Sequence, residues 1–502
     1  MYSLLSGAKM PVIIDNRSEV SSMFERCHYR TMPVMLGLLL GGLGCASAPA
    51  KSPVLTKVDV PLEPPVAKEP TTLLPQAPMG APVVIENVTL LTARTERARI
   101  ENGWIRLANG RIVALGAGTP PAGPSDEQRI DGQGGYVTPG LIDTHSHMGV
   151  YSKPGVWAHA DGNEMTNPIR AGVRAEEAFW PQDPSIERAV GGGVTTIQVL
   201  PGSGNLMGGR AVVLKLRPRR DSRSMRFPGA RDGLKMACGE NPKRVYGKYR
   251  KALPMSRMGS LYLMRETWVK ARRYQNEWAT WRKNPQKKEG DQIISAKPPT
   301  RDLMLETLAQ VLEGNILVHI HCYRADEMLL QIKLAKEFGY SIRSFHHAVE
   351  AYKIRDVLAV NDISVSTWAD WWGFKIEAYD AVEQNLALLA EAGALGILHP
   401  DSPEGIQRMN QEASKAYYAG LNSGVKISEN DALRWITANA AWALGIEEEV
   451  GTLKVGKMAD VVLWDRHPFS VYARAQKVFI DGYLVHEDGR TATRWSDFEV
   501  GQ

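Results

Sequence analysis

The chain has 502 residues, of which 44% are hydrophobic and 23% are charged, an ordinary balance for a globular protein. This length can bury a large core and predicts more than one structural unit. The formal net charge of +5 is too small over such a length to indicate nucleic acid as a partner.

The first 50 residues have the pattern of a secretory signal. Arg26 and Arg30 precede an apolar stretch over residues 32–44, and small residues follow over residues 45–50. The order of basic, apolar and small segments predicts export, and the apolar run is too short to cross a membrane. We therefore expect the mature protein in the periplasm.

The end of this signal is compatible with two kinds of processing. Residues 42–45, Gly-Leu-Gly-Cys, are similar to an imperfect lipobox, which would leave Cys45 as a lipidated N-terminus and anchor the protein to a membrane. Simple cleavage after Ala48 or Ala50 is the alternative. Residues 51–81 are rich in proline and predict an extended linker after the signal.

The remaining cysteines do not predict a disulfide framework. With Cys27 and Cys45 in the signal, only Cys238 and Cys322 remain for the mature protein, and we expect both as thiols. Stability should then come from the hydrophobic core.

Short strands are predicted at both ends of the mature chain. Residues 82–138 contain strand-like runs joined by an Asn109-Gly110 turn, and residues 448–495 contain a matching set joined by Asp481-Gly482. The two sets predict one discontinuous β-sandwich whose parts flank the central region.

The central region, residues 139–447, alternates strands and helices and predicts an α/β fold, a (β/α)8 TIM barrel. Helical patterns cover residues 326–338 and 381–392, and residues 243–299 form an enlarged insertion with a basic helix over buried tryptophans. The apolar strand candidates are residues 194–200, 211–216, 233–237, 316–321, 341–345, 363–367 and 394–398.

The first candidate metal-binding residues lie at the start of the predicted barrel. In residues 138–147, Thr-Pro-Gly-Leu-Ile-Asp-Thr-His-Ser-His, the side chains of His145 and His147 share one face of a strand. At the end of a barrel strand two imidazoles on this face can bind one metal ion. Asp143 shares the face and is expected to support the histidines from behind.

These residues resemble the first-strand signature of the amidohydrolase superfamily. Residues 437–460, with Thr-Ala-Asn-Ala-Ala, Gly-Thr-Leu and Ala-Asp, resemble its closing segment. The likeness extends over about residues 82–490 and is greatest to the imidazolonepropionase-like and prolidase-like branch. It implies a hydrolase of amide, peptide or cyclic amide bonds, with dimers or other homo-oligomers common.

The resemblance also implies further metal ligands at later strand ends. His321 matches the histidine of strand five, with His319 as the competitor on the same face. His347 matches the histidine of strand six, with His346 as the alternative. Asp401 matches the aspartate of strand eight, which is also the general acid and base in this family.

Strand four offers two bridging groups. The resemblance implies that the dinuclear members carry a carboxylated lysine at this position, which bridges two ions. Lys235 fits it, because it lies alone in an apolar strand where burial would favour the neutral amine that reacts with carbon dioxide. Glu240 follows the same strand and is the rival carboxylate, whereas Lys215 lies one strand too early. If neither bridges two ions, the site is mononuclear.

The ligand set predicts zinc, with iron, manganese or cobalt as alternatives, and Asp401 as proton carrier to the departing nitrogen. Tyr323, His346 and His399 are predicted substrate contacts. The partner is then a small amide or peptide. Two other functions stay open: a mononuclear imidazolonepropionase-like ring hydrolase or deaminase, and a non-catalytic binding protein on the same fold.

Overall fold

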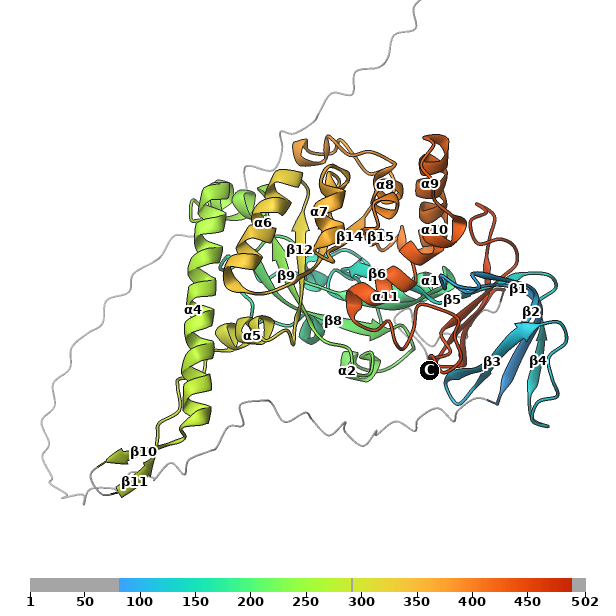
Figure 1. Ribbon diagram of the computed structural model, residues 1–502, viewed down its shortest axis with the longest axis horizontal. Helices are drawn as coiled ribbons and strands as arrows, with labels where there is room; N and C mark the ends of the chain where they lie inside the picture. The colour runs from blue at the N-terminus through green and yellow to red at the C-terminus, as the bar shows by residue number, and fades with distance from the viewer. Residues whose placement is uncertain (1–80, 290–291, 490–502) are drawn as a thin grey trace, which may run out of the picture. The chain divides into compact units, whose positions relative to one another are not determined.

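The computed structural model describes residues 81–289 and 292–489 (Figure 1). The predicted signal over residues 1–50, including Cys45, and the linker up to residue 80 lie outside the described residues. In the described part of the chain, no helix is both long and apolar enough to span a membrane.

One sheet is built from the two ends of the described chain, as Figure 1 shows by its blue and red strands. Its centre is the antiparallel pairing of β5 with β16, which joins Thr138 to Val462 and Val137 to Leu463. Buried aliphatic residues of both ends form its core. The strands are β1 (Val83–Leu91), β2 (Arg99–Ala108), β3 (Arg111–Ala117), β4 (Gln128–Asp131), β5 (Tyr136–Pro139), β16 (Val461–Trp464), β17 (Ala475–Ile480) and β18 (Tyr483–Glu487).

A second sheet of eight strands forms the barrel, and its strands are neighbours in chain order. This confirms the predicted α/β barrel with an attached sheet built from both ends of the chain. The apolar runs of the sequence become strands that are buried on both faces. The strands are β6 (Leu141–Ser146), β7 (Val194–Val199), β8 (Met207–Lys215), β9 (Gly233–Ala237), β12 (Leu317–Cys322), β13 (Ile342–His347), β14 (Ser364–Thr367) and β15 (Gly396–Leu398).

The barrel departs from uniform parallel pairing at β8, which runs antiparallel to both β7 and β9. The connection from β7 to β8 covers only residues 200–206, too few for the crossover helix that a parallel neighbour needs. The other strand pairs of the barrel are parallel.

The side of the barrel between β15 and β6 is covered by the end of the helical region. Ile142 N donates a hydrogen bond to Ile436 O at 3.0 Å, and Asn439 Nδ2 donates to Gly396 O at 2.9 Å. The chain around residues 436–439 thereby satisfies backbone groups of both strands, which lie inside the protein and need partners.

Helices surround the barrel strands in Figure 1. β10 (Gln286–Glu289) and β11 (Gln292–Ser295) pair beyond the end of α4. The helices are α1 (Ser185–Gly191), α2 (Ser222–Met225), α3 (Glu240–Lys243), α4 (Arg257–Lys283), α5 (Leu303–Leu312), α6 (Ala325–Phe338), α7 (Arg355–Val360), α8 (Asn385–Glu391), α9 (Met409–Asn422), α10 (Glu429–Trp435) and α11 (Ala438–Leu444).

Helix α4 is the basic helix predicted for the insertion. It packs against α5 and α6, and its N-terminus is capped by Ser256, whose side chain accepts from Gly259 N. Trp268 and Trp278 lie on its buried side, as predicted, and Trp281 Nε1 donates to Ala296 O at 2.9 Å. The tryptophans therefore anchor the helix through packing.

Replacing Trp268 by Ala should lower the free energy of unfolding by about 3–5 kcal/mol, because the fully buried ring leaves a cavity. The ring also stacks on Tyr340 at a centroid distance of 4.4 Å. Chemical denaturation measures the loss. Val269→Ala is the matched control, since Val269 is 56% exposed on the same helix and its change should stay within about 0.5 kcal/mol.

The expectation of two free thiols is wrong. Cys238, just after β9, and Cys322, at the end of β12, form a disulfide. β9 and β12 are adjacent parallel strands, and their register brings the two strand ends together. Spacing in the sequence did not show this, because the cysteines are 84 positions apart and the whole insertion lies between them.

Candidate active site

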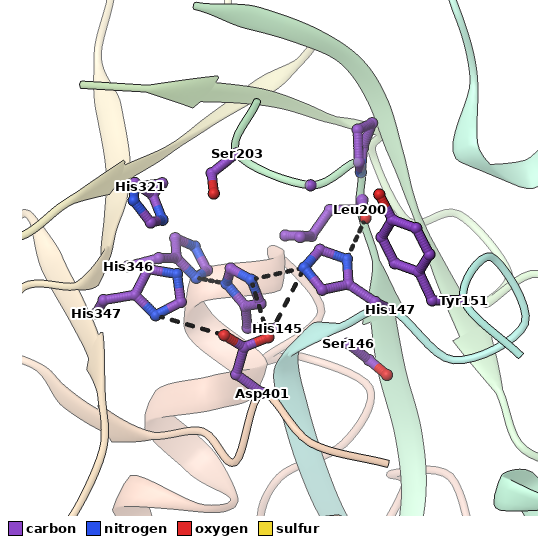
Figure 2. Close-up of polar contacts among 12 residues, drawn as sticks. His145, Ser146, His147, Tyr151, Leu200, Ser203, His321, His346, His347 and Asp401 are labelled. Carbon is purple, nitrogen blue, oxygen red and sulfur yellow. Dashed lines mark hydrogen bonds and ion pairs between the residues drawn. The ribbon is translucent and has the colours of Figure 1, made fainter. Parts of the chain in front are cut away.

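Strand ends of the barrel bring together most of the predicted site residues, as Figure 2 shows. His145 lies on β6, His321 on β12 and His347 on β13, while His147 follows β6 and Asp401 follows β15. Their side chains converge although the residues are up to 256 positions apart in the sequence, because neighbouring barrel strands end at the same mouth.

The Asp401 carboxylate is the centre of the cluster. Its Oδ1 lies 3.7 Å from His145 Nε2 and 3.7 Å from His147 Nε2, and its Oδ2 lies 3.8 Å from His347 Nδ1. The ligand atoms of His145, His147 and Asp401 all lie within 4.8 Å of one another, close enough to hold one metal ion. Nitrogen and oxygen donors at such a point are typical of a zinc-type site.

The ring of His147 is oriented by the backbone. Its Nδ1 lies 2.8 Å from the carbonyl oxygen of Leu200, so this nitrogen carries the hydrogen and donates it. The lone pair is then on Nε2, which faces His145 Nε2 at 3.3 Å and Asp401. A carbonyl partner of this kind is a common way to orient a metal-binding histidine.

The strand-six position brings both of its histidines into the site. Regular alternation would point His346 and His347 to opposite faces. His347 has a φ of +70°, in the left-handed region, and this local twist turns its ring toward Asp401. His347 Nδ1 is buried without a hydrogen-bond partner, whereas both nitrogens of His346 contact other histidines.

The strand-five position separates its two histidines by depth. His321 Nε2 lies 3.2 Å from Asn241 Nδ2, and its Nδ1 has no partner. His319 lies deeper, with Nδ1 2.9 Å from His346 Nε2 and Nε2 3.2 Å from Gln198 Nε2. His319 therefore has no free nitrogen to offer a metal ion, and His321 does.

His399, a predicted substrate contact, lies inside the cluster. It is 1% exposed, and its ring is stacked against His145 at a centroid distance of 5.0 Å. Nitrogen atoms of His145, His347 and His399 make a second group within 4.8 Å. His399 is thus a neighbour of the candidate metal ligands.

The two candidate bridging groups of strand four, and Lys215 on the strand before it, differ in their surroundings. Lys235 is 1% exposed and its Nζ donates to Pro201 O at 2.9 Å. The side chain of Glu240 is 27% exposed, with Oε1 3.9 Å from Lys375 Nζ. Lys215 is bound elsewhere, between Asp460 at 2.9 Å and Asp481. Lys235 is the group that lies buried beside the histidine cluster.

Burial sets the charges of the site. It lowers the pKa of His147 to about 3 and that of His399 to about 3, so these rings are neutral near pH 7, as metal ligands must be. Burial also raises the pKa of Asp401 and lowers that of Lys235, although the attraction between the two groups opposes both shifts. Asp143 accepts from His145 N at 3.0 Å, and burial raises its pKa.

Aromatic side chains line one side of the cluster. Trp368, at the end of β14, stacks on His347 at 4.5 Å, and Trp371 stacks on Trp368 at 5.4 Å. Tyr323 stacks on His347 at 5.4 Å, while Phe374 contacts both Tyr323 and Trp368 edge-on. Because Trp371 and Phe374 are 43% and 56% exposed, this aromatic wall leads from solvent to a metal-ligand position.

Four residues around the site were missed by sequence reasoning. Asn241 follows the rival Glu240, and Lys375 places its Nζ 3.9 Å from the centre of the Tyr323 ring. Gln198 is a polar residue in an apolar strand, a signal that could have been noticed. Nothing local in the sequence distinguishes Trp368 or Lys375, which reach the site through the loop after β14.

Comparison with known proteins places the chain in a family. The amidohydrolase family model matches residues 379–485. The crystal structure of an amidohydrolase from Thermotoga maritima MSB8 is 33% identical, covers 81% of this chain and 100% of that one, and superposes with a TM-score of 0.72. The chain belongs to the amidohydrolase family.

Curated members of this hydrolase family agree with the assignment. Amidohydrolase tasK of Hapsidospora irregularis is 31% identical over 441 residues, which cover 82% of this chain and 44% of tasK, so the chain spans less than half of that relative. Imidazolonepropionase of Streptococcus pyogenes is 25% identical over 441 residues, covering 78% of this chain and 92% of that enzyme.

Proposed function

We propose that this amidohydrolase is a metal-dependent hydrolase of amide, peptide or cyclic amide C–N bonds, with Asp401 as general acid and base. One observation carries the proposal: a single half-buried carboxylate lies 3.7–3.8 Å from nitrogens of three histidines on two separate strand ends. Family membership supplies the reaction class, and this geometry supports the proposed roles.

The residues present fit a divalent cation. Buried ring nitrogens of His321, His347 and His399 have no protein partner, which is costly unless something else binds them. Imidazole and carboxylate donors suit zinc, and also iron, manganese or cobalt. A bound ion would supply Lewis acidity, which makes a water molecule nucleophilic near neutral pH.

The protein's own groups divide the remaining work. Asp401 accepts a proton from the attacking water and returns it to the departing nitrogen, since its two oxygens face opposite sides of the histidine cluster. His145 and His147 would contribute donor nitrogens from the end of β6, while the Trp368 ring stacks on His347 and keeps water from that face of it.

The number of ions distinguishes the leading function from its rival. Lys235, once carboxylated, would bridge two ions, and its buried place beside the cluster supports it over Glu240. Metal analysis of the purified protein, with a screen of dipeptides, N-acyl amino acids and cyclic amides, tests this. Two ions per chain favour the amide or peptide hydrolase, one favours a ring hydrolase or deaminase, and none with no turnover favours a binding protein.

Replacing Trp371 by Ala should raise KM by roughly fivefold for substrates with an aryl group and leave kcat nearly unchanged, because a stacking partner of about 1 kcal/mol is lost. Steady-state kinetics on matched aryl and alkyl amides measures the difference. Trp372→Ala is the control, since Trp372 is 58% exposed and contacts Tyr379 instead of Trp368. Equal effects of both variants would contradict a substrate role for the wall.

We also propose that the protein is exported, either as a free periplasmic enzyme or anchored through a lipid on Cys45. The signal-like order of residues 1–50 supports export, and the Cys238–Cys322 disulfide is of a kind that persists in oxidising compartments. Fractionation of cells with and without Cys45→Ser would separate lipidation from simple cleavage. Association of identical chains stays a prediction, which light scattering can test.

A further inference from the structure

Three histidine rings and one amide form a continuous chain of contacts beneath the candidate metal site. Gln198 Nε2 lies 3.2 Å from His319 Nε2, and His319 Nδ1 lies 2.9 Å from His346 Nε2. His346 Nδ1 in turn lies 2.8 Å from His145 Nδ1. All four side chains are at most 1% exposed, and they come from four different strands, β6, β7, β12 and β13.

A glycine makes room for the contact between Gln198 and His319, which is the end of this series of contacts away from the candidate metal site. A Cβ added at Gly233 would lie 2.9 Å from Gln198 Nε2 and 3.1 Å from His319 Cδ2. Both distances are shorter than ordinary carbon contacts, so only glycine lets the amide and the ring meet at this point of β9. The contact between Gln198 and His319 therefore depends on a specific small residue in a third strand.

Along this chain of contacts, the hydrogens must all be donated in the same direction. A neutral imidazole has one N–H and one lone pair, so a ring that accepts at one nitrogen donates at the other. Burial lowers the pKa of His319 to about 3 and holds those of His145 and His346 well below the usual value, which keeps the rings neutral. The hydrogen on either nitrogen of His145 is thus linked to the orientation of the Gln198 amide.

His145, at the end of the contact chain next to the candidate metal site, selects the direction of hydrogen donation. His145 Nε2 faces His147 Nε2 at 3.3 Å and Asp401 Oδ1 at 3.7 Å, so a cation bound there needs the lone pair of Nε2. The hydrogen of His145 is then on Nδ1 and is donated to His346. His346 donates from Nε2 to His319, and His319 donates from Nε2 to Gln198.

Gln198 can complete this direction because its oxygen is free to accept. With Nε2 directed at His319, Gln198 Oε1 is buried without a hydrogen-bond partner. A half-turn of the amide brings Oε1 to His319 Nε2 and gives the oxygen its partner. The direction that suits a metal ion is therefore open to Gln198, because either end of its amide can occupy the position next to His319 Nε2.

We propose that Gln198, His319 and His346 are positioning residues that set the ring tautomer of His145 for binding a divalent cation. The inference rests on the proposed function, because it concerns the cation of that site. Outer partners of metal-binding histidines orient the ring and raise its basicity, and their loss weakens metal binding by about 10–100-fold.

The first test compares apparent zinc dissociation constants, measured by chelator competition. Gln198→Met removes the terminal acceptor while keeping the side-chain length, and should weaken zinc binding by about 10–100-fold. Gln198→Glu keeps an acceptor and should stay within about threefold of the wild type. Thr196→Val is the control. Thr196 is buried two residues away on the same face of β7 and lies outside the chain of contacts, so the zinc affinity of this variant should equal that of the wild type.

The second test observes the tautomers of the zinc-loaded wild type, through NMR of ring-¹⁵N histidine, with signals assigned from single His→Asn variants. We expect hydrogen on Nδ1 of His145 and on Nε2 of both His319 and His346. Any other pattern overturns the proposal. If Gln198→Met does not fold, this NMR measurement alone decides whether the positioning role is correct.

The two proposals fail in different ways. If the wild type binds no divalent metal, the proposed function is wrong and the tautomer inference falls with it. If the wild type binds zinc and folded Gln198→Met binds it equally well, only the positioning role is wrong.

Discussion

Asp401→Asn is expected to lower kcat by at least about a thousandfold while leaving the protein folded. Asparagine has nearly the same shape but cannot take a proton from water, and it removes the negative charge of the carboxylate that faces His145, His147 and His347. Steady-state kinetics on the best substrate from the amide and peptide screen measures the loss, and circular dichroism reports the fold.

Asp131→Asn is the matched control for this substitution. Asp131 lies on β4 of the terminal sheet, where it accepts hydrogen bonds from Asn87 and Gln133 at the surface. Its replacement should leave kcat unchanged. If Asp401→Asn kept more than a tenth of the wild-type kcat, the assignment of Asp401 as proton carrier would be wrong.

Removal of divalent metal with a chelator is expected to abolish hydrolysis, and added Zn²⁺ should restore it. A cation that binds only the folded protein also stabilises it, by about 4 kcal/mol at a thousandfold excess over its Kd. Zn²⁺ should therefore raise the Tm of the stripped protein. Turnover at full rate with less than about a tenth of an ion per chain would contradict a metal-dependent reaction.

The variant pair for this experiment uses two histidines in different places. His145→Ala should lose the Zn²⁺-induced rise in Tm, because His145 belongs to both groups of candidate ligands. His486→Ala should keep the rise, since His486 lies on β18 of the terminal sheet. A rise that survives in His145→Ala would place the ion elsewhere in the protein.

The strand-six histidines show how far a sequence pattern reaches. Alternation along a strand predicts that one of His346 and His347 faces the barrel interior, and it leaves the choice open. The structure uses both: His346 faces inward in the regular register with His321, and the positive φ of His347 turns the next ring into the site. A backbone twist at one residue is decided by the packing around it, so the sequence pattern does not contain it.

The cysteines and β8 show a similar limit. Composition indicated two leftover thiols, yet Cys238 and Cys322 meet because β9 and β12 become neighbours across a long insertion. The apolar pattern found β8 as a strand but not its direction, which follows from the short connection that precedes it.

The amino-acid sequence by itself determined the eight barrel strands and the strand sets at the chain's two ends, and its resemblance to the family indicated the candidate metal-ligating residues at successive strand ends. These follow from local periodicity and from the order of motifs along the chain. Only the tertiary structure decided that Lys235 lies in the cluster while Glu240 faces Lys375, that His319 and His346 contact each other, and that Trp368 covers His347. Such contacts join side chains that are far apart in the sequence, and the partner of a ring nitrogen depends on which side chains the closed barrel brings within hydrogen-bond distance.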